Sequence, residues 1–469
     1  MSSHAVVLGA GPAGLGAALR LAQRSAFKVT VVEKGSAVGG NAGGFEMEGI
    51  PVDFGSHRLH PACRPDILDD IRRMLGPDLL LRPRHGRIKL RGRWIHFPLK
   101  PLDLLLQLPP SFAAGVIGDG VSKLVAKSSG DDATFATVLE AGLGRTICRD
   151  FYFPYARKIW GVPPEDLDPV QARRRVSAGS LGKMIRKALN ALPGARSEHT
   201  GRFFYPRGGF GQISNAFYRA CVERGVEVRF DCAVTSIDVC GGRLRSVTVD
   251  GGRTRLDAHL ALSTIPLPAL VQTMKPSAPA EVLRSARALE YRSMLLIYLA
   301  LDTERFTEFD AHYFPGQEVS ITRLSEPKNY GLCHRPGVTV LCAELPCSKS
   351  SDWWKASDAE LSALVLRDLQ TAGLPVQVAV RNVVVRRLAQ AYPIYTRSYR
   401  EHFERIDRWV ETIDGLLTFG RQGLFAHDNT HHTLAMAYAA EECVSDDAAI
   451  DRAQWAAHRR AFESHVVED

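Results

Sequence analysis

A glycine-rich turn near the N-terminus has the spacing that a bound dinucleotide requires. The pattern from Gly9 to Gly14 is G-x-G-x-x-G, preceded by an apolar run at residues 5–8 and followed by helical apolar spacing at residues 15–22. A pyrophosphate must approach the backbone closely at such a helix N-terminus, where free N–H groups and the helix dipole favour anionic oxygens. The residues expected to contact the cofactor in this turn are Gly9, Gly11, Pro12, Ala13 and Gly14.

An acidic residue follows the next apolar segment at the distance that a ribose needs. Residues 28–32 are predicted to form a second strand, which ends at Glu33 and Lys34. Glu33 comes about 20 positions after Gly14, where an acidic side chain meets a ribose hydroxyl in dinucleotide-binding domains. The strand, turn, helix and acid together predict a bound adenine dinucleotide, and a glycine turn without a ligand is the alternative.

Composition limits the class of protein. The chain has 469 residues with 45% hydrophobic content, enough for two or three domains. A net charge of +8 serves solubility or attracts an anionic ligand, and the sequence has no basic run with interleaved aromatics, so we expect no nucleic acid partner. Nine cysteines without a C-x-x-C pair predict neither a zinc site nor a disulfide framework, and hence a cytoplasmic protein. The sequence contains no run of about 20 apolar residues, so we predict no membrane-spanning helix.

The order of predicted elements indicates an α/β fold. Alternating segments at 226–230, 233–239, 244–249 and 259–265 are predicted to complete the sheet begun near residue 5. Strands at 295–301, 338–345 and 376–388 are predicted to form a second sheet. The leucine-rich stretch 99–125 is either a helical cover over a pocket or a membrane-surface patch.

We therefore predict three parts with a ligand cleft between them. The expected division is a Rossmann-like dinucleotide-binding domain built from the discontinuous segments 1–60, 204–268 and 405–469, a helical substrate subdomain at 61–203, and an antiparallel-sheet substrate domain at 269–404.

Beyond Glu33 the chain carries further ordered motifs. Gly39-Gly40-Asn41 is followed by Gly55-Ser56-His57 and His60. Here the chain resembles the FAD enzymes that include amine oxidases, protoporphyrinogen oxidases, phytoene desaturases and UDP-galactopyranose mutases, with details most similar to the mutases. The similar mutase motifs are G-P-H-x-x-H, Y-T-x-K-Q-W-G at 155–161, P-x-x-G-[YF] at 206–210, T-R-x-x-E-x-K at 322–328 and G-R-x-G-x-[YF] at 420–425.

This resemblance implies FAD as the cofactor and gives roles to individual residues. The implied catalytic residues are His57, Tyr155, Trp160, Arg174 and Arg323. The implied cofactor contacts, beyond the turn, are Glu33, Lys34, Gly40, Asn41, His57, Val234, Gly420, Arg421 and Leu424. The implied substrate contacts are Tyr155, Trp160, Arg174, Arg323, Tyr392 and Tyr395. No metal site is expected, because His427, His431 and His432 have no ligand-helix spacing.

Each of these roles has a structural alternative. Arg323 could form an ordinary surface ion pair with Glu326, the arginines at 173–175 could be a solvated helix face, and the four aromatic residues could belong to the core. The chain also departs from the mutase pattern, because Phe425 is followed by alanine and not by the arginine of that motif. The substrate sugar could therefore differ from galactopyranose.

Two enzyme functions follow, besides an FAD-binding protein without activity. In the first, reduced FAD serves a pyranose–furanose rearrangement of a nucleoside-diphosphate sugar, and arginines bind the departing diphosphate. In the second, oxidised FAD takes a hydride from an alcohol, amine or C–C unit. A small-molecule partner is expected in both, and a homo-oligomer is compatible with the sequence.

Overall fold

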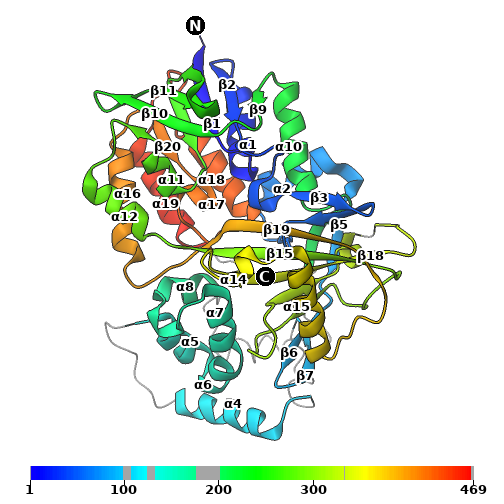
Figure 1. The fold of residues 1–469 in the computed structure, drawn as a ribbon. Helices are drawn as coiled ribbons and strands as arrows, with labels where there is room; N and C mark the ends of the chain where they lie inside the picture. The colour runs from blue at the N-terminus through cyan, green and yellow to red at the C-terminus, as the bar shows by residue number, and fades with distance from the viewer. Residues whose placement is uncertain (1, 99–106, 124–132, 176–200, 332, 466–469) are drawn as a thin grey trace.

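The computed structural model describes residues 2–98, 107–123, 133–175, 201–331 and 333–465. Figure 1 shows three regions: a sheet with helices around β1 and α1, a central layer that contains β15, β18 and β19, and a group of helices, α4 to α8, on the far side of that layer. No helix among the described residues combines the length and apolar character needed to cross a bilayer.

The first region is a parallel sheet assembled from distant parts of the chain. Its strand order is β20 (Leu416–Thr418), β13 (Leu260–Ser263), β1 (Ser3–Leu8), β2 (Phe27–Val32) and β9 (Glu227–Arg229). Every pairing in it is parallel. The last four residues of β1 are fully buried, which is typical of a parallel sheet covered on both faces. The Rossmann-like sheet from discontinuous segments is therefore confirmed.

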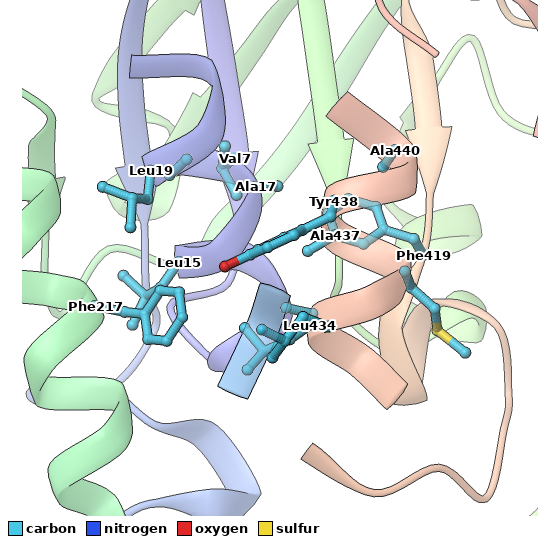
Figure 2. Close-up of a cluster of buried hydrophobic side chains, with 14 of the residues drawn as sticks. Val7, Leu15, Ala17, Leu19, Phe217, Phe419, Leu434, Ala437, Tyr438 and Ala440 are labelled. Atoms are coloured by element: carbon cyan, nitrogen blue, oxygen red, sulfur yellow. The ribbon is translucent and has the colours of Figure 1, made fainter. Parts of the chain in front are cut away.

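Helix α1 (Pro12–Ala22) packs against α18 (Thr430–Glu442) and α10 (Gly211–Glu223) on one face of this sheet, as Figure 2 shows. Leu15 of α1 is fully buried, and burial of one such side chain contributes roughly 1.5–3 kcal/mol. A Cβ at Gly16 would lie 2.9 Å from Leu434 Cδ2, so glycine allows the two helices to approach closely. This packing fixes the start of α1, where the glycine turn lies.

The segments 233–239 and 244–249 do not join the first sheet, which corrects the prediction. They form β10 (Val234–Cys240) and β11 (Arg243–Val249), an antiparallel hairpin whose turn, Gly241-Gly242, has positive φ. With β12 (Thr254–Asp257) and β14 (Met274–Lys275) they form a separate sheet. Its apolar side chains cover the other face of the parallel sheet, where they pack against Val6 and Leu8 of β1. The alternation of apolar and polar residues could not show whether these strands continue the parallel sheet or form a separate sheet.

The central layer is a seven-stranded sheet, and its three predicted strands are confirmed. The order is β19 (Val380–Pro393), β15 (Tyr291–Leu301), β18 (Thr339–Cys347), β17 (Arg323–Ser325), β16 (Ala311–Tyr313), β6 (Gly86–Leu90) and β7 (Arg93–Phe97). Only the pair of β16 with β6 is parallel.

Three strands lie inside the segment 61–203, which the sequence predicted as mostly helical. Strands β6 and β7 complete the central sheet, and β5 (Leu79–Pro83) pairs with β8 (Arg202–Pro206). The alternating burial of β6 shows the period of two that the helical interpretation overlooked. The domain boundaries themselves remain a prediction.

The remaining elements connect these layers. Helices α5 (Phe135–Leu143), α6 (Arg145–Ile147), a π-helical turn (Cys148–Tyr152), α7 (Phe153–Trp160) and α8 (Pro169–Arg175) follow α4 (Pro110–Lys123). The leucine-rich stretch includes residues 99–106, which lie outside the described residues. The other elements are α2 (Pro65–Leu75), β3 (Gly44–Met47), β4 (Ile50–Asp53), α11 (Leu267–Gln272), α12 (Ala280–Ala288), α13 (Lys328–Gly331), α14 (Asp352–Lys355), α15 (Asp358–Thr371), α16 (Tyr399–Glu411), α17 (Gly420–Gly423) and α19 (Arg452–Phe462).

Candidate functional site

A cavity of about 710 Å³ begins at the glycine turn and reaches the central sheet. At one end it is lined by the β1–α1 turn and the residues after β2, and at the other by β17, β19 and the turn before α18. It therefore joins the predicted dinucleotide site to the predicted substrate domain.

The glycine turn has the geometry that a pyrophosphate needs. Gly9 has a φ of +103°, which other residues rarely adopt. A Cβ at Gly14 would lie 1.9 Å from the carbonyl oxygen of Gly9, so only glycine permits this packing of helix against strand. Gly9, Gly11, Pro12 and Ala13 line the cavity, whereas Gly14 supports the turn from below.

Glu33 lies at the end of β2 on the cavity wall. Its two carboxylate oxygens accept hydrogen bonds from the backbone N–H groups of Ala10 and Gly35, each at 2.8 Å. Each oxygen keeps a lone pair, so the carboxylate can also accept a ribose hydroxyl. Lys34 and Val234 line the same end of the cavity. These positions are compatible with the predicted adenosine contacts.

His57 lines the cavity as a neutral ring. Its Nε2 lies 2.9 Å from the carbonyl oxygens of both Asn41 and Phe54, so Nε2 carries the proton and Nδ1 keeps its lone pair. Burial lowers the pKa of His57 to about 4, and the nearby Arg323 and Arg421 contribute to the decrease. At neutral pH this imidazole is therefore uncharged and can accept a hydrogen bond at Nδ1.

Arg323 projects from the start of β17 and forms a buried ion pair that the sequence did not predict. Its Nε and Nη2 donate to the two oxygens of Glu344, each at 2.9 Å, and the two side chains are 13% and 5% exposed. Burial disfavours the charge of Arg323, but Glu344 raises its pKa, so the guanidinium stays a cation. The expected alternative partner, Glu326, is not the one that Arg323 contacts.

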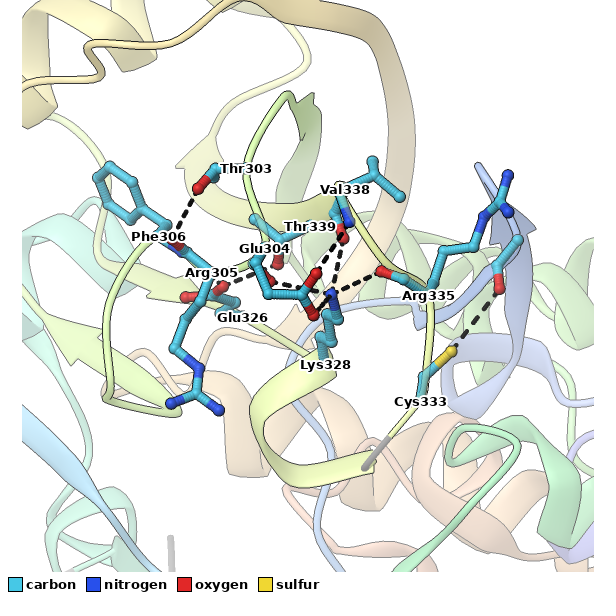
Figure 3. Close-up of polar contacts among 12 residues, drawn as sticks. Thr303, Glu304, Arg305, Phe306, Glu326, Lys328, Cys333, Arg335, Val338 and Thr339 are labelled. Carbon is cyan, nitrogen blue, oxygen red and sulfur yellow. Dashed lines mark hydrogen bonds and ion pairs between the residues drawn. The ribbon is translucent and has the colours of Figure 1, made fainter.

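The other charged residues of the T-R-x-x-E-x-K motif support loops, as Figure 3 shows. Glu326 accepts hydrogen bonds from the backbone N–H groups of Phe306 and Thr307 and from the Thr339 hydroxyl. Lys328 is 8% exposed, pairs with Glu304 and donates to three backbone carbonyls. Of the motif's three charged side chains, Arg323 is the one that lines the cavity.

The sequence did not single out three further arginines on the cavity wall, Arg58, Arg84 and Arg387. Arg58 and Arg84 line it together with Tyr313, and Arg58 donates to the Tyr313 hydroxyl at 3.3 Å. Arg58 also lies 3.3 Å from Asp310 and over the Phe203 ring. Arg58 directly follows His57 and occupies a variable position of the G-P-H-x-x-H motif, so the motif did not indicate that Arg58 lines the cavity.

The four aromatic residues with a predicted substrate role pack among other side chains. Trp160 and Tyr395 are each 2% exposed, and both contact His427 edge to face at 4.8 Å. Tyr392 contacts Trp160, and Tyr155, a half-buried residue of α7, packs against the same group of apolar side chains. None of these four belongs to the described lining of the cavity. The core alternative describes the buried Trp160 and Tyr395, whereas Tyr155 and Tyr392 are half-buried. The substrate role of all four remains a prediction.

The C-terminal motif places Arg421 on the cavity wall. Arg421 donates to the carbonyl oxygens of Ala391 and Asp428 and lies over the Tyr392 ring at 5.0 Å. Gly420 has positive φ and packs against Ala13, while Leu424 is buried behind the turn. Only Arg421 of these three lines the cavity. Gly40 and Asn41 also line the cavity, and Asn41 donates to the carbonyl oxygen of Gln390 at 3.2 Å.

The arginines at 173–175 lie at the end of α8. Arg173 is exposed, while the side chains of Arg174 and Arg175 lie outside the described residues. The predicted phosphate role of Arg174 therefore stays a prediction.

Sequence reasoning missed most of the polar cavity wall. Gln390 lies on the edge strand β19, and Asn429 forms a capping box at the start of α18. Asparagine is a common N-cap residue, but nothing in the sequence placed Asn429 beside the cavity. The further polar lining residues include Thr264, Gln422, Asp428, Thr430 and Thr433.

Asp428, His432 and His465 bring possible metal-ligand atoms within 4.8 Å of one another. The rings of His432 and His465 stack at 4.2 Å with 12° between their planes. A metal ion lies in the plane of each imidazole that binds it, so one ion cannot bind both stacked rings in this arrangement. The absence of a metal remains an expectation.

Comparison with known proteins identifies the family. The model of the flavin-containing amine oxidoreductases matches residues 12–440. The phytoene dehydrogenase of Streptomyces griseus is 23% identical over 61% of this chain and 59% of its own length, and the zeta-carotene-forming phytoene desaturase of Myxococcus xanthus is 26% identical over 66% and 62%. The chain thus spans about three fifths of the length of these curated relatives.

Solved structures show the same fold. A reduced UDP-galactopyranose mutase aligns with a TM-score of 0.79 and 19% identity over 94% of this chain and 93% of that one. Cyclohexylamine oxidase from Brevibacterium oxydans aligns with a TM-score of 0.65 and 17% identity over 94% and 99%. The glycine turn, Glu33 and the cavity fit a flavin dinucleotide, and FAD is the cofactor. The chain belongs to the flavin-containing amine oxidoreductase family.

Proposed function

We propose that this FAD-dependent enzyme acts on a small anionic substrate, a nucleoside-diphosphate sugar, and rearranges its sugar ring with reduced FAD. The observation that carries this proposal is the arginine-rich cavity wall, which Arg58, Arg84 and Arg323 line together with Tyr313. A hydrocarbon substrate gains nothing from such a wall, whereas a diphosphate is recognised well by guanidinium groups.

The chain's own residues have distinct tasks in this scheme. FAD, when bound, supplies the nucleophilic or hydride-transfer chemistry. Arg323 presents a cation whose orientation Glu344 fixes, so it can stabilise negative charge on a departing diphosphate. His57 keeps a lone pair at Nδ1 and can accept a hydrogen bond from a hydroxyl group there.

A net oxidation or desaturation is the second candidate function. The family match and the names of the two carotenoid relatives favour it. In that case the arginines hold an acidic substrate and His57 accepts a hydrogen bond at Nδ1.

One experiment separates these functions. FAD-loaded protein is reduced with dithionite under anaerobic conditions and incubated with a panel of UDP-sugars, and the products are separated by chromatography. The proposal expects an isomeric sugar nucleotide, with the flavin still reduced at the end. Oxidised enzyme that is bleached anaerobically by an alcohol or amine, without any turnover of UDP-sugars, would contradict the mutase proposal and favour the second candidate.

A further inference from the structure

Lys158 is a buried lysine whose three donors meet three carbonyl groups of one loop. Its Nζ lies 2.6 Å from the Phe314 oxygen, 2.8 Å from the Gly316 oxygen and 2.9 Å from the Ile321 oxygen. An ammonium group has three N–H donors and a neutral amine has two. Only the charged form of Lys158 can therefore satisfy all three carbonyls.

The three carbonyls belong to the loop that connects β16 to β17, residues 314–322. Tyr313 and Arg323 are register partners at the two ends of this loop, and both line the cavity. Within the loop, Phe314 donates its N–H to the Thr322 oxygen at 3.0 Å. The position of the 314–322 loop thus affects the backbone positions of Tyr313 and Arg323, from which the two cavity-lining side chains extend.

Helix α7, which carries Lys158, is itself anchored to the central sheet. Arg292 of β15 donates to the carbonyl oxygens of Ile159 and Lys158 at the end of α7, at 3.1 and 3.3 Å. Gly161 follows α7 with a φ of +73°, and a Cβ there would lie 2.5 Å from Arg292 Nη1. The helix is therefore a fixed support from which Lys158 can hold the loop.

We propose that Lys158 is a positioning residue whose ammonium group fixes the 314–322 loop to α7 and thereby holds Tyr313 and Arg323 on the cavity wall. Asp368 of α15 supports the same loop from another side, through the N–H groups of Ser320 and Ile321. Lys158 and Asp368 thus bind opposite kinds of backbone group.

The proposal predicts a dependence on pH. Burial lowers the pKa of Lys158 to about 8, although the carboxylates of Glu318 and Asp368 oppose the decrease. Lys158 is therefore mainly charged at pH 7 and mainly neutral at pH 9. Loss of the third donor should loosen the loop over this interval.

Hydrogen exchange measured by mass spectrometry tests the proposal on FAD-loaded protein. Lys158→Met should raise the exchange of peptides that cover the 314–322 loop at least tenfold at pH 7, and Lys158→Arg should restore much of the protection. Lys328→Met is the matched control, because Lys328 is also buried and also binds three carbonyls, but of other loops. Equal exchange of the 314–322 loop in Lys158→Met and wild type, or an equal rise in Lys328→Met, would overturn the proposal.

The wild-type protein gives a test that needs no variant. After correction for intrinsic rates, exchange of the 314–322 loop should increase from pH 7 to pH 9 more than exchange of β15. An unchanged ratio would overturn the requirement for the ammonium form.

A second measurement rests on the proposed function and uses UDP as the probe. UDP affinity, followed by the flavin absorbance, should fall at least fivefold in Lys158→Met and stay unchanged in Lys328→Met. If wild type does not bind UDP, the proposed substrate class fails, whereas the exchange data still decide the role of Lys158.

Discussion

The buried pair of Arg323 and Glu344 makes a quantitative prediction about stability. Removal of one partner from a buried ion pair leaves an uncompensated charge and typically costs 3–5 kcal/mol, whereas an apolar replacement of both is often close to neutral. With side chains only 13% and 5% exposed, this pair belongs to that buried class. We expect Arg323→Met and Glu344→Met each to lower the free energy of unfolding by about 3 kcal/mol.

The double variant distinguishes a buried charge pair from two independent packing defects. Glu344 also accepts the N–H of Ser56, so the double variant should keep a residual loss of about 1–2 kcal/mol. The coupling energy from wild type, the two single variants and the double variant should then be about 4 kcal/mol or more. Urea unfolding of FAD-loaded protein, followed by circular dichroism, supplies the four free energies.

An exposed pair on α16 provides the control. Arg405 and Glu401 lie 2.9 Å apart with 41% and 68% of their side chains exposed, and such pairs contribute about 0.3–0.5 kcal/mol. Arg405→Met should therefore change stability little. Additive losses in the Arg323 and Glu344 series, with a coupling energy no larger than that of the α16 pair, would refute the assignment of a buried charge pair.

Three other outcomes follow from the structure. Gly14→Val should abolish FAD binding, because its Cβ would collide with the Gly9 carbonyl; a 450 nm flavin band of normal intensity in the purified variant would contradict this. Burial raises the pKa of Asp53 from its ordinary value of 3.8 to about 7, so the free energy of unfolding should fall by roughly 2 to 3 kcal/mol between pH 5 and 7.5 in wild type relative to Asp53→Asn, as measured by urea titration; equal pH slopes would contradict the assignment. His57 should show no titration near pH 6.5, because its pKa is about 4; a step in the flavin spectrum near pH 6.5 that disappears in His57→Asn would argue for a solvated ring.

The first 33 residues were the most predictable part of the molecule. Their strand, turn and helix depend on local requirements: glycine where φ is positive, and apolar side chains where both faces of a sheet are covered. The acidic residue after β2 follows from the same local geometry. Binding of an adenine dinucleotide could therefore be inferred from these residues alone, whereas FAD as that dinucleotide was implied only by the resemblance of the later motifs.

The predicted strands of the central sheet also followed from local pattern, but their neighbours did not. Strands β6 and β7 join the sheet through a parallel pairing with β16, more than 200 residues away in the chain. The hairpin of β10 and β11 has the same alternation and yet forms a separate layer. Local alternation specifies a strand, whereas its partner depends on which apolar faces remain uncovered.

The sequence by itself determined the cofactor turn and the identity of Arg323 as a charged residue of interest. Only the tertiary structure decided that Glu344 is its partner, that Arg58 and Arg84 share its cavity, and that Lys158 holds the loop beside it. The physical reason is that backbone geometry is encoded within a few residues, whereas the environment of a charge depends on groups that folding brings together from distant segments.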